Sequence, residues 1–275
     1  MVKKIKLKII DNIVQILEIA ILAISIVIPY LVDFQNIFRE YMMKEYPKPE
    51  NFILLLALNK GNLAISVAFF VFVFLKIRKY NLNCIMCNKN IYHDYSYFWF
   101  CFCAKILGIN NCNLVLVPIW LQFKLVINNI FQGYPLNEKE YPVIEDERET
   151  KILKRGKVHE AREINLILED TYPISEFQIP QSKRGFPVIK LSRNDGKDLG
   201  RHFSEQFINA IITEVRMLEN GVIVNVFATT NPMNTINIAS RVFKNADRGN
   251  IDSLYVYKQK NIGGREFESK GKKIY

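Results

Sequence analysis

Four cysteines in the middle of the chain have the residue types, and part of the spacing, of a zinc site. Cys84 and Cys87 form a C-x-x-C pair, and Cys101 and Cys103 form a C-x-C pair downstream. Structural zinc sites commonly use two knuckle-like pairs, but the second pair here lies in a run of aromatic residues, where cysteine often serves as a small buried hydrophobe. We therefore expect reduced, metal-free thiols, with zinc ligation and palmitoylation as the alternatives.

Residues for nucleophilic or acid–base catalysis are scarce in the second half of the chain. No cysteine follows Cys112, and the two histidines are His159 and His202. The sequence contains no G-x-S-x-G, H-E-x-x-H or Walker A pattern. His159 falls in a charged stretch and His202 near the start of an expected helix, where each is most simply a surface or capping side chain. The sequence thus favours a protein that is not an enzyme and needs no cofactor.

Polar side chains that could bind an anion gather in two loops, residues 192–202 and residues 229–234. Each loop follows an apolar segment and leads into an expected helix. In an open α/β sheet both loops emerge at the carboxyl edge, where ligands usually bind, and unpaired N–H groups at helix starts favour phosphate. The same residue types are common in turns and N-caps without any ligand. The predicted ligand-binding residues are Ser192, Arg193, Lys197, Arg201, His202, Thr229, Thr230 and Asn231.

Hydrophobic patterning predicts the elements that position these loops. Short apolar runs indicate strands, and apolar residues at helical spacing, followed by Gly221, indicate a helix and its end. Strands alternating with helices indicate an α/β fold with a mostly parallel sheet. The expected strands are residues 163–169, 186–191, 221–230 and 253–258, and the expected helices are residues 200–220 and 234–244.

The amino-terminal part of the chain carries the apolar segments of a membrane protein. Residues 13–32 are predominantly apolar, and about 20 such residues are needed to cross the hydrocarbon layer as a helix. A second apolar run is interrupted by Asn59-Lys60-Gly61-Asn62, so we expect its crossing over residues 63–77. A signal peptide is the alternative for the first segment, but no small-residue cleavage site follows it. We predict a transmembrane helical hairpin.

Two further apolar stretches, residues 95–109 and 113–131, leave the number of crossings at two or four. They contain Lys105, Pro118 and Lys124 among many aromatic residues. Aromatic crowding of this kind is typical of the headgroup region. Two crossings with interfacial segments are therefore favoured over four, and either even number returns the chain to its starting side.

Basic residues predict the orientation of the hairpin in a cell membrane. They flank its two outer limits, so the positive-inside rule places both termini in the cytoplasm. The rest of the net charge of +10 is spread over a mixed-sign sequence, which gives no support for a specific nucleic-acid partner. The flanking residues are Lys3, Lys4, Lys6, Lys8, Lys76, Arg78 and Lys79.

Composition shifts divide the chain into four expected parts. Its 49% hydrophobic residues exclude a disordered chain, and five cysteines are too few for a disulfide scaffold. The parts are a transmembrane helical hairpin (1–80), an aromatic and Cys-rich interfacial or additional membrane segment (81–133), a charged connector (134–162) and a cytoplasmic α/β domain (163–275).

This layout leads to two hypotheses of function. In outline it is similar to bacterial two-helix membrane effectors fused to nucleotide-sensing Rossmann-like domains, although no motif carries a family assignment. We predict a membrane-anchored sensor or effector whose α/β domain binds a small anionic, nucleotide-like ligand and couples it to the membrane helices. Its partners would be the lipid membrane, this ligand, and further copies of the chain or a membrane complex. The alternative is a non-enzymatic scaffold subunit of a secretion, conjugation or envelope complex.

Overall fold

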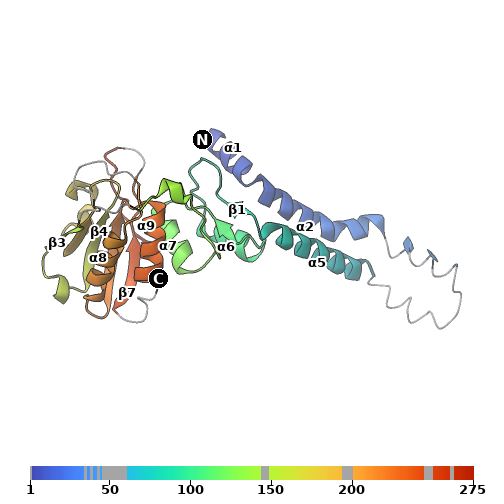
Figure 1. Cartoon of the computed structure of the whole chain (residues 1–275). Coiled ribbons are helices and arrows are strands. Elements are labelled where there is room, and N and C mark those ends of the chain that lie inside the picture. Colours follow the sequence, from blue (N-terminus) through green and yellow to red (C-terminus); the bar gives the residue numbers. More distant parts are fainter. Residues whose placement is uncertain are drawn as a thin grey trace. The chain divides into compact units, whose positions relative to one another are not determined.

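The computed structural model describes residues 2–33, 36–37, 40–41, 44, 61–143, 149–193, 201–244, 250–260 and 263–275. The chain forms two compact units (Figure 1). The first comprises Met1–Lys89 and Phe98–Asn111, and the second comprises Asn90–Tyr97 and Cys112–Tyr275.

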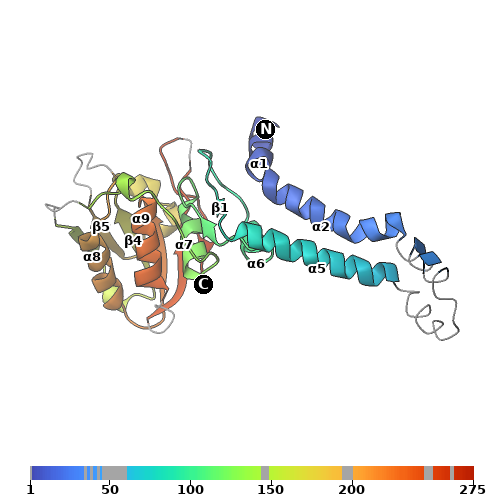
Figure 2. The same ribbon diagram turned by 45° about the vertical axis from the view of Figure 1, so that its right-hand side comes forward.

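The first unit is built around two antiparallel helices that lie side by side, α2 (Ile13–Val32) and α5 (Gly61–Asn81) (Figures 1 and 2). Near the end of α2 the Ser66 hydroxyl donates to the Ile26 carbonyl at 2.9 Å. Near its start the Asn81 amide donates to the Glu18 carboxylate at 3.1 Å. The unit also contains α1 (Val2–Asp11), β1 (Ile85–Met86) and most of α6 (Tyr97–Lys105). The region for which a transmembrane hairpin was predicted therefore contains two antiparallel helices in contact.

The helix α2 buries two polar side chains, Glu18 and Ser25, and exposes aliphatic ones. Its buried residues are Glu18, Leu22, Ser25 and Pro29, which recur every three or four positions. Large aliphatic side chains such as Leu17 are exposed along the helix. This arrangement is the reverse of a helix in water and suits a helix whose outer surface meets lipid. Within the described residues α2 is the one helix long and apolar enough to cross a membrane.

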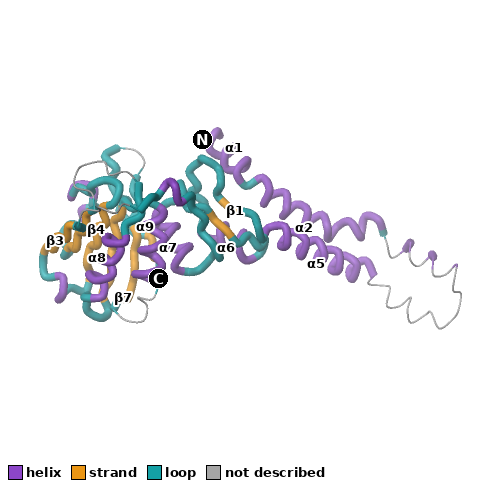
Figure 3. Tube along the Cα trace, viewed as in Figure 1, coloured by secondary structure: helices purple, strands orange, loops and turns teal. Residues whose placement is uncertain are grey.

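The second unit contains a six-stranded sheet in the order β3-β5-β4-β6-β7-β8, and Figure 3 draws the strands of the chain in orange. Its four central strands are parallel, and the two edge strands are antiparallel to their neighbours. The α/β class and the mostly parallel sheet thus agree with the prediction. The strands are β3 (Lys151–Arg155), β4 (Glu163–Glu169), β5 (Val188–Ser192), β6 (Val222–Ala228), β7 (Ile251–Val256) and β8 (Lys272–Lys273).

The two faces of this sheet are covered differently. Helices α8 (Glu205–Arg216) and α9 (Pro232–Ile238), which continues as a π-helical turn (Ala239–Phe243), lie on one face (Figures 1 and 2). The other face carries the β4–β5 connection and the chain after β7, and no long helix lies there among the described residues. Right-handed crossovers explain this division, because β5 lies on one side of β4 and β6 on the other. The core of that second face is Ile167, Ile174, Ile179, Val188, Phe227, Tyr257 and Phe267.

Three elements differ from the sequence expectation. The helix expected over residues 200–220 begins at Glu205, because the Ser204 hydroxyl caps it by accepting from the Phe207 N–H. His202 therefore precedes the helix and is not in its first turn. Strand β3 lies inside the expected connector, and all five of its residues are exposed. The strand β8 was not expected either.

The apolar stretches after the hairpin form short helices. Each of α6 and α7 (Ile119–Ile127) has nine residues, less than half of the roughly 20 needed to cross a membrane. The alternative of four crossings is therefore wrong for these segments. Helix α7 packs within the second unit, where the rings of Phe123 and Phe243 lie 5.8 Å apart. The remaining short elements are β2 (Asn111–Cys112), η1 (Glu138–Glu140), η2 (Val158–Glu160), η3 (Glu176–Gln178) and η4 (Gln181–Lys183).

Candidate functional site

The carboxyl ends of β4 and β6 meet at the point where the strand order reverses. The chain passes from β4 to β5 on one side and then returns to β6 on the other side of β4. Ligands of open α/β sheets bind in the crevice at such a switch point. Asp170 directly follows β4, and Thr229 directly follows β6. The side chains at this sheet edge therefore determine which ligand could bind there.

Asp170 lies at the centre of a buried polar network at this edge. Its Oδ2 atom accepts three hydrogen bonds of 2.9 Å, from the backbone N–H and side-chain amide of Asn231 and from the side-chain amide of Asn234. Its Oδ1 atom accepts from Nε of Arg193 at 2.7 Å and is paired with the same guanidinium through Nη2. Both carboxylate oxygens of Asp170 are thus fully engaged in hydrogen bonds within the protein.

Arg193 and His202 connect the ends of the first predicted loop. The Nη1 atom of Arg193 lies 2.8 Å from Nδ1 of His202. The backbone carbonyl of His202 accepts from the side-chain amides of Asn231 at 2.9 Å and Asn234 at 3.2 Å. The described ends of the first predicted loop, Arg193 and His202, therefore lie beside the second loop at one edge of the sheet, and Asp170 joins them.

The threonines of the second loop fix its backbone. The Thr229 hydroxyl donates to the Tyr172 carbonyl at 2.8 Å. The hydroxyls of Thr230 and Thr235 lie 2.7 Å apart, and Thr235 also donates to the carbonyl of Asn231 at 2.8 Å. The side chains of Thr229, Thr230, Asn231 and Thr235 are all buried. They therefore support the sheet edge from the protein interior.

The network is costly to disturb because it contains a desolvated ion pair. The side chains of Arg193 and Asp170 are 1% and 0% exposed. Removing one partner of such a pair leaves an uncompensated buried charge, which typically costs about 3–5 kcal/mol. The pair therefore fixes Arg193, at the start of the first loop, against Asp170.

The site residues predicted from the sequence divide into a buried group and one exposed residue. Ser192, at the end of β5, belongs to the buried group. Arg201 is exposed and offers its guanidinium to solvent. Lys197 lies outside the described residues. The buried residues are Ser192, Arg193, His202, Thr229, Thr230 and Asn231.

Sequence reasoning missed Asp170 and Asn234, the two side chains that complete the network. The available signal was position, because Asp170 is the first residue after an apolar strand that neighbours β6. Asn234 stands in the second loop and was not assigned a role. Nothing in the sequence indicated that both would be used to join the two loops.

A buried hydroxyl lies close to Arg201. Tyr141 is 3% exposed, and its hydroxyl has no hydrogen-bond partner within the described part of the chain. Burial raises the pKa of Tyr141, while the positive charge of Arg201 acts in the opposite direction. The adjacent residues are anchored, since the Phe203 N–H donates to the Pro142 carbonyl at 3.1 Å. Arg201 and Tyr141 thus supply a cation and a hydroxyl beside the buried network.

The cysteines form no metal centre in the described ranges, where no group of three or more His, Cys, Asp or Glu side chains could hold a metal ion. Cys87 and Cys103 are buried, and Cys84 and Cys101 are partly exposed. Burial, with smaller contributions from Cys87 and Glu18, raises the pKa of the Cys103 thiol far above its usual range. This thiol is therefore protonated and unreactive at neutral pH.

A family model matches the chain over residues 1–275, and its description is "SMODS- and Ubiquitin system-associated 2TM effector domain". The match covers both compact units. None of the curated proteins matches the chain.

Proposed function

The chain belongs to the family of SMODS- and Ubiquitin system-associated 2TM effector domains, and we propose that its α/β domain binds a small anionic, nucleotide-like ligand at the carboxyl edge of the sheet. The protein is a membrane-associated effector. In the proposed mechanism, ligand binding in the α/β domain is coupled to the membrane helices.

The observation that carries this proposal is the junction of the two loops at Asp170. The network lies at the topological switch point, where α/β sheets bind ligands. The network consists of buried groups whose hydrogen bonds are satisfied. Such a set can hold neighbouring exposed side chains in position, as a preorganised site requires. Thr229 and Asn231 from one loop and Arg193 from the other are held in fixed positions by contacts of 2.7–2.9 Å.

The proposed ligand contacts at this edge are the exposed Arg201 and the buried hydroxyl of Tyr141 beside it. Arg201 would donate charge-assisted hydrogen bonds to a phosphate, and the Tyr141 hydroxyl would gain the partner that the described residues do not give it. Lys197 belongs to the same predicted set by its sequence position. Arg193 acts as a positioning residue, because Asp170 and His202 already occupy its guanidinium.

In the membrane we propose that α2 and α5 are the two crossings and that both termini are cytoplasmic. The lysines before α2 and the cluster Lys76, Arg78 and Lys79 near the end of α5 support this orientation. A pair of helices encloses no pore by itself, so we also propose that the effector acts as a homo-oligomer or with a membrane-complex partner.

A thermal-shift screen of the full chain in a neutral detergent tests the ligand proposal. The panel contains linear and cyclic nucleotides and inorganic phosphate. A ligand that binds the native state raises the midpoint of unfolding, so at least one nucleotide should do so in a concentration-dependent manner. A protein that co-purifies with the chain, with no shift from any nucleotide, would support the scaffold alternative instead.

A further inference from the structure

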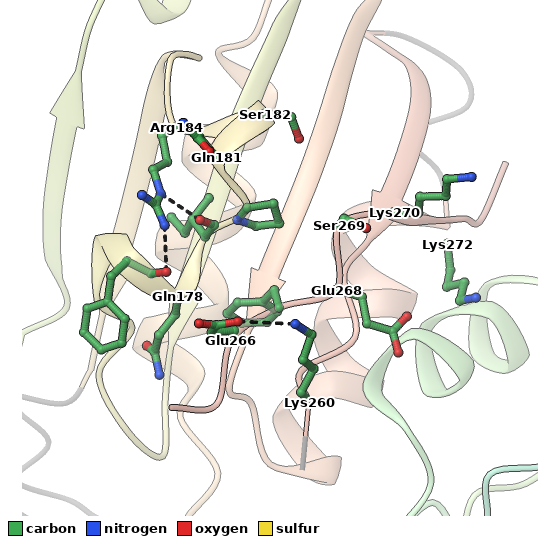
Figure 4. A pocket seen from close by; sticks show the side chains of 14 residues that line it. Gln178, Gln181, Ser182, Arg184, Lys260, Glu266, Glu268, Ser269, Lys270 and Lys272 are labelled. Atoms are coloured by element: carbon green, nitrogen blue, oxygen red, sulfur yellow. Dashed lines mark hydrogen bonds and ion pairs between the residues drawn. The ribbon is translucent and has the colours of Figure 1, made fainter. Parts of the chain in front are cut away.

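A pocket of about 630 Å³ lies in the second unit between the β4–β5 connection and the chain after β7 (Figure 4). One wall is formed by residues 177–184 and the other by Lys260 and residues 266–272. Neither segment belongs to the two loops at the carboxyl edge. The volume is within the range of small-molecule sites in proteins, which is roughly 300–1,000 Å³.

Hydrogen bonds between the two walls fix the shape of this pocket. The Phe267 N–H donates to the Gln178 carbonyl at 2.9 Å, and the Gln178 side-chain amide donates to the Gly264 carbonyl at 2.9 Å. Ile179 and Phe267, one from each wall, are both buried. The pocket is therefore part of the folded sheet domain and not a gap between loose segments.

Gly271 allows the carboxyl-terminal wall to lie against the sheet. A Cβ atom at this position would be 2.7 Å from the ring of Tyr257, closer than real side chains approach. Tyr257 is itself buried, with its hydroxyl 3.3 Å from the Asn225 side-chain oxygen. The close packing of Gly271 places Lys270 and Lys272 at the wall of the pocket.

The charges of this pocket are unevenly paired. Lys260 forms an ion pair with Glu266 at 3.2 Å, so these two charges offset each other. Arg184 donates to the carbonyls of Phe177 and Ile179 at 2.8 Å, and no ion pair joins it to an acidic side chain within the described residues.

The remaining charges favour an anion. The side chains of Lys270 and Glu268 form no hydrogen bond or ion pair with other described residues, and Lys272 lies over the Trp120 ring, with its Nζ atom 5.7 Å from the ring centroid. Figure 4 shows Glu268, Ser269, Lys270 and Lys272 together on one wall. The positively charged side chains of the pocket therefore outnumber the acidic side chains that could neutralise them. Ser269 adds a hydroxyl on the same wall as Lys270 and Lys272.

We propose that this pocket binds a phosphate group. Lys270 and Lys272 would supply the charge, Ser269 would donate a hydrogen bond, and Arg184 would add a positive potential from the opposite wall. The phosphate could belong to the headgroup of an anionic phospholipid or to a soluble molecule. Both sources present the same chemistry to the pocket.

Two probes distinguish these sources with the full chain in neutral detergent. The soluble probe is inorganic pyrophosphate, and the lipid probe is dihexanoyl phosphatidylglycerol, with dihexanoyl phosphatidylcholine as its uncharged control. Binding is measured by titration for the wild type and for Lys270→Gln, Glu268→Gln and Lys151→Gln. Lys151 is an exposed lysine on β3, outside the pocket.

The proposal predicts opposite effects of the two pocket variants. Lys270→Gln should weaken binding by about tenfold, the loss of one charge-assisted contact, whereas Glu268→Gln should strengthen binding because it removes a repelling carboxylate. Lys151→Gln should leave the affinity unchanged. Binding of pyrophosphate alone identifies a soluble ligand, and binding of phosphatidylglycerol alone identifies a lipid. Failure of both probes to bind, or equal losses in Lys270→Gln and Lys151→Gln with unaltered unfolding midpoints, would overturn the proposal.

Discussion

Asp170 and Arg193 form an ion pair that is almost completely removed from solvent and joins the chain after β4 to the chain after β5. The same carboxylate accepts hydrogen bonds from Asn231 and Asn234, which follow β6. One side chain therefore ties together the ends of three neighbouring parallel strands.

Asp170→Asn should destabilise the α/β domain by about 3–5 kcal/mol, because it leaves the guanidinium of Arg193 buried without a counter-charge. The free energy of unfolding of the full chain in detergent, followed by circular dichroism in urea, measures this loss. The control is Glu219→Gln, which alters an exposed carboxylate. Equal stabilities of the two variants would show that the pair does not hold the sheet edge.

Glu205→Gln should reduce stability by less than about 1 kcal/mol at neutral pH, since the partner Arg241 and Glu205 are both partly exposed. The hydrogen bond from Arg241 lowers the pKa of Glu205 below its ordinary value of 4.5. A carboxylate with a lowered pKa stabilises the fold above that range and loses this effect as the pH falls through its folded-state pKa. The difference between wild type and variant should therefore vanish in acid, and a difference that grows below pH 4.5 would contradict the assignment.

Gly271→Ala should lower the free energy of unfolding by about 1–3 kcal/mol, because the new methyl group overlaps the buried ring of Tyr257. Gly185→Ala is a matched control, since no heavy atom lies within 4 Å of a Cβ atom placed there. Thermal unfolding of the two variants provides the comparison. A smaller effect at Gly271 than at Gly185 would be inconsistent with the packing described for the carboxyl-terminal wall.

Asn81→Leu should weaken the association of α2 and α5, because Asn81 donates both to the Glu18 carboxylate at 3.1 Å and to the Leu107 carbonyl at 3.0 Å. Interhelical hydrogen bonds in membranes are worth about 0.6–2 kcal/mol. Titration with sodium dodecyl sulfate measures the stability of the helix pair. Tyr80→Leu, at an exposed neighbouring position, should have little effect, and equal losses would remove the special role of Asn81.

The topology of the membrane hairpin has its own test. Basic residues flank both outer limits of the hairpin, which predicts cytoplasmic termini. Reporter domains fused at residue 45 and at the carboxyl end should therefore report opposite sides of the membrane. Reporters on the same side would exclude a hairpin with two crossings.

Local patterning was sufficient to predict the central strands and the class of fold. The apolar run over residues 163–169 is the strand β4 with the predicted bounds, since buried parallel strands consist of continuous apolar residues. Edge strand β3 escaped prediction because its residues are all exposed and carry no buried pattern. Helix α8 begins later than predicted because Ser204 is its N-cap. The position of Ser204 depends on a contact with a residue distant in sequence, since its backbone N–H donates to the Asn234 side-chain oxygen at 3.1 Å.

The loops at the candidate site were predictable as neighbours, but their internal bonding was not. The rule that parallel strands end at one edge of the sheet placed residues 192–202 and 229–234 together. Arg193 was expected to meet a ligand, yet it is paired with Asp170, a residue outside both loops. Such a pairing depends on the register of β4 against β5 and β6, which local sequence patterns do not encode.

The most direct test of the proposed function is the affinity of the full chain for the nucleotide that gives the largest thermal shift, compared between Arg201→Ala and Arg216→Ala. Both variants remove an exposed arginine, but only Arg201 lies at the carboxyl edge beside the Asp170 network. We predict that Arg201→Ala weakens binding by about tenfold or more, one lost charge-assisted contact, with an unchanged unfolding midpoint and with no change of affinity in Arg216→Ala. Equal affinities of the two variants and the wild type would contradict a ligand site at this edge.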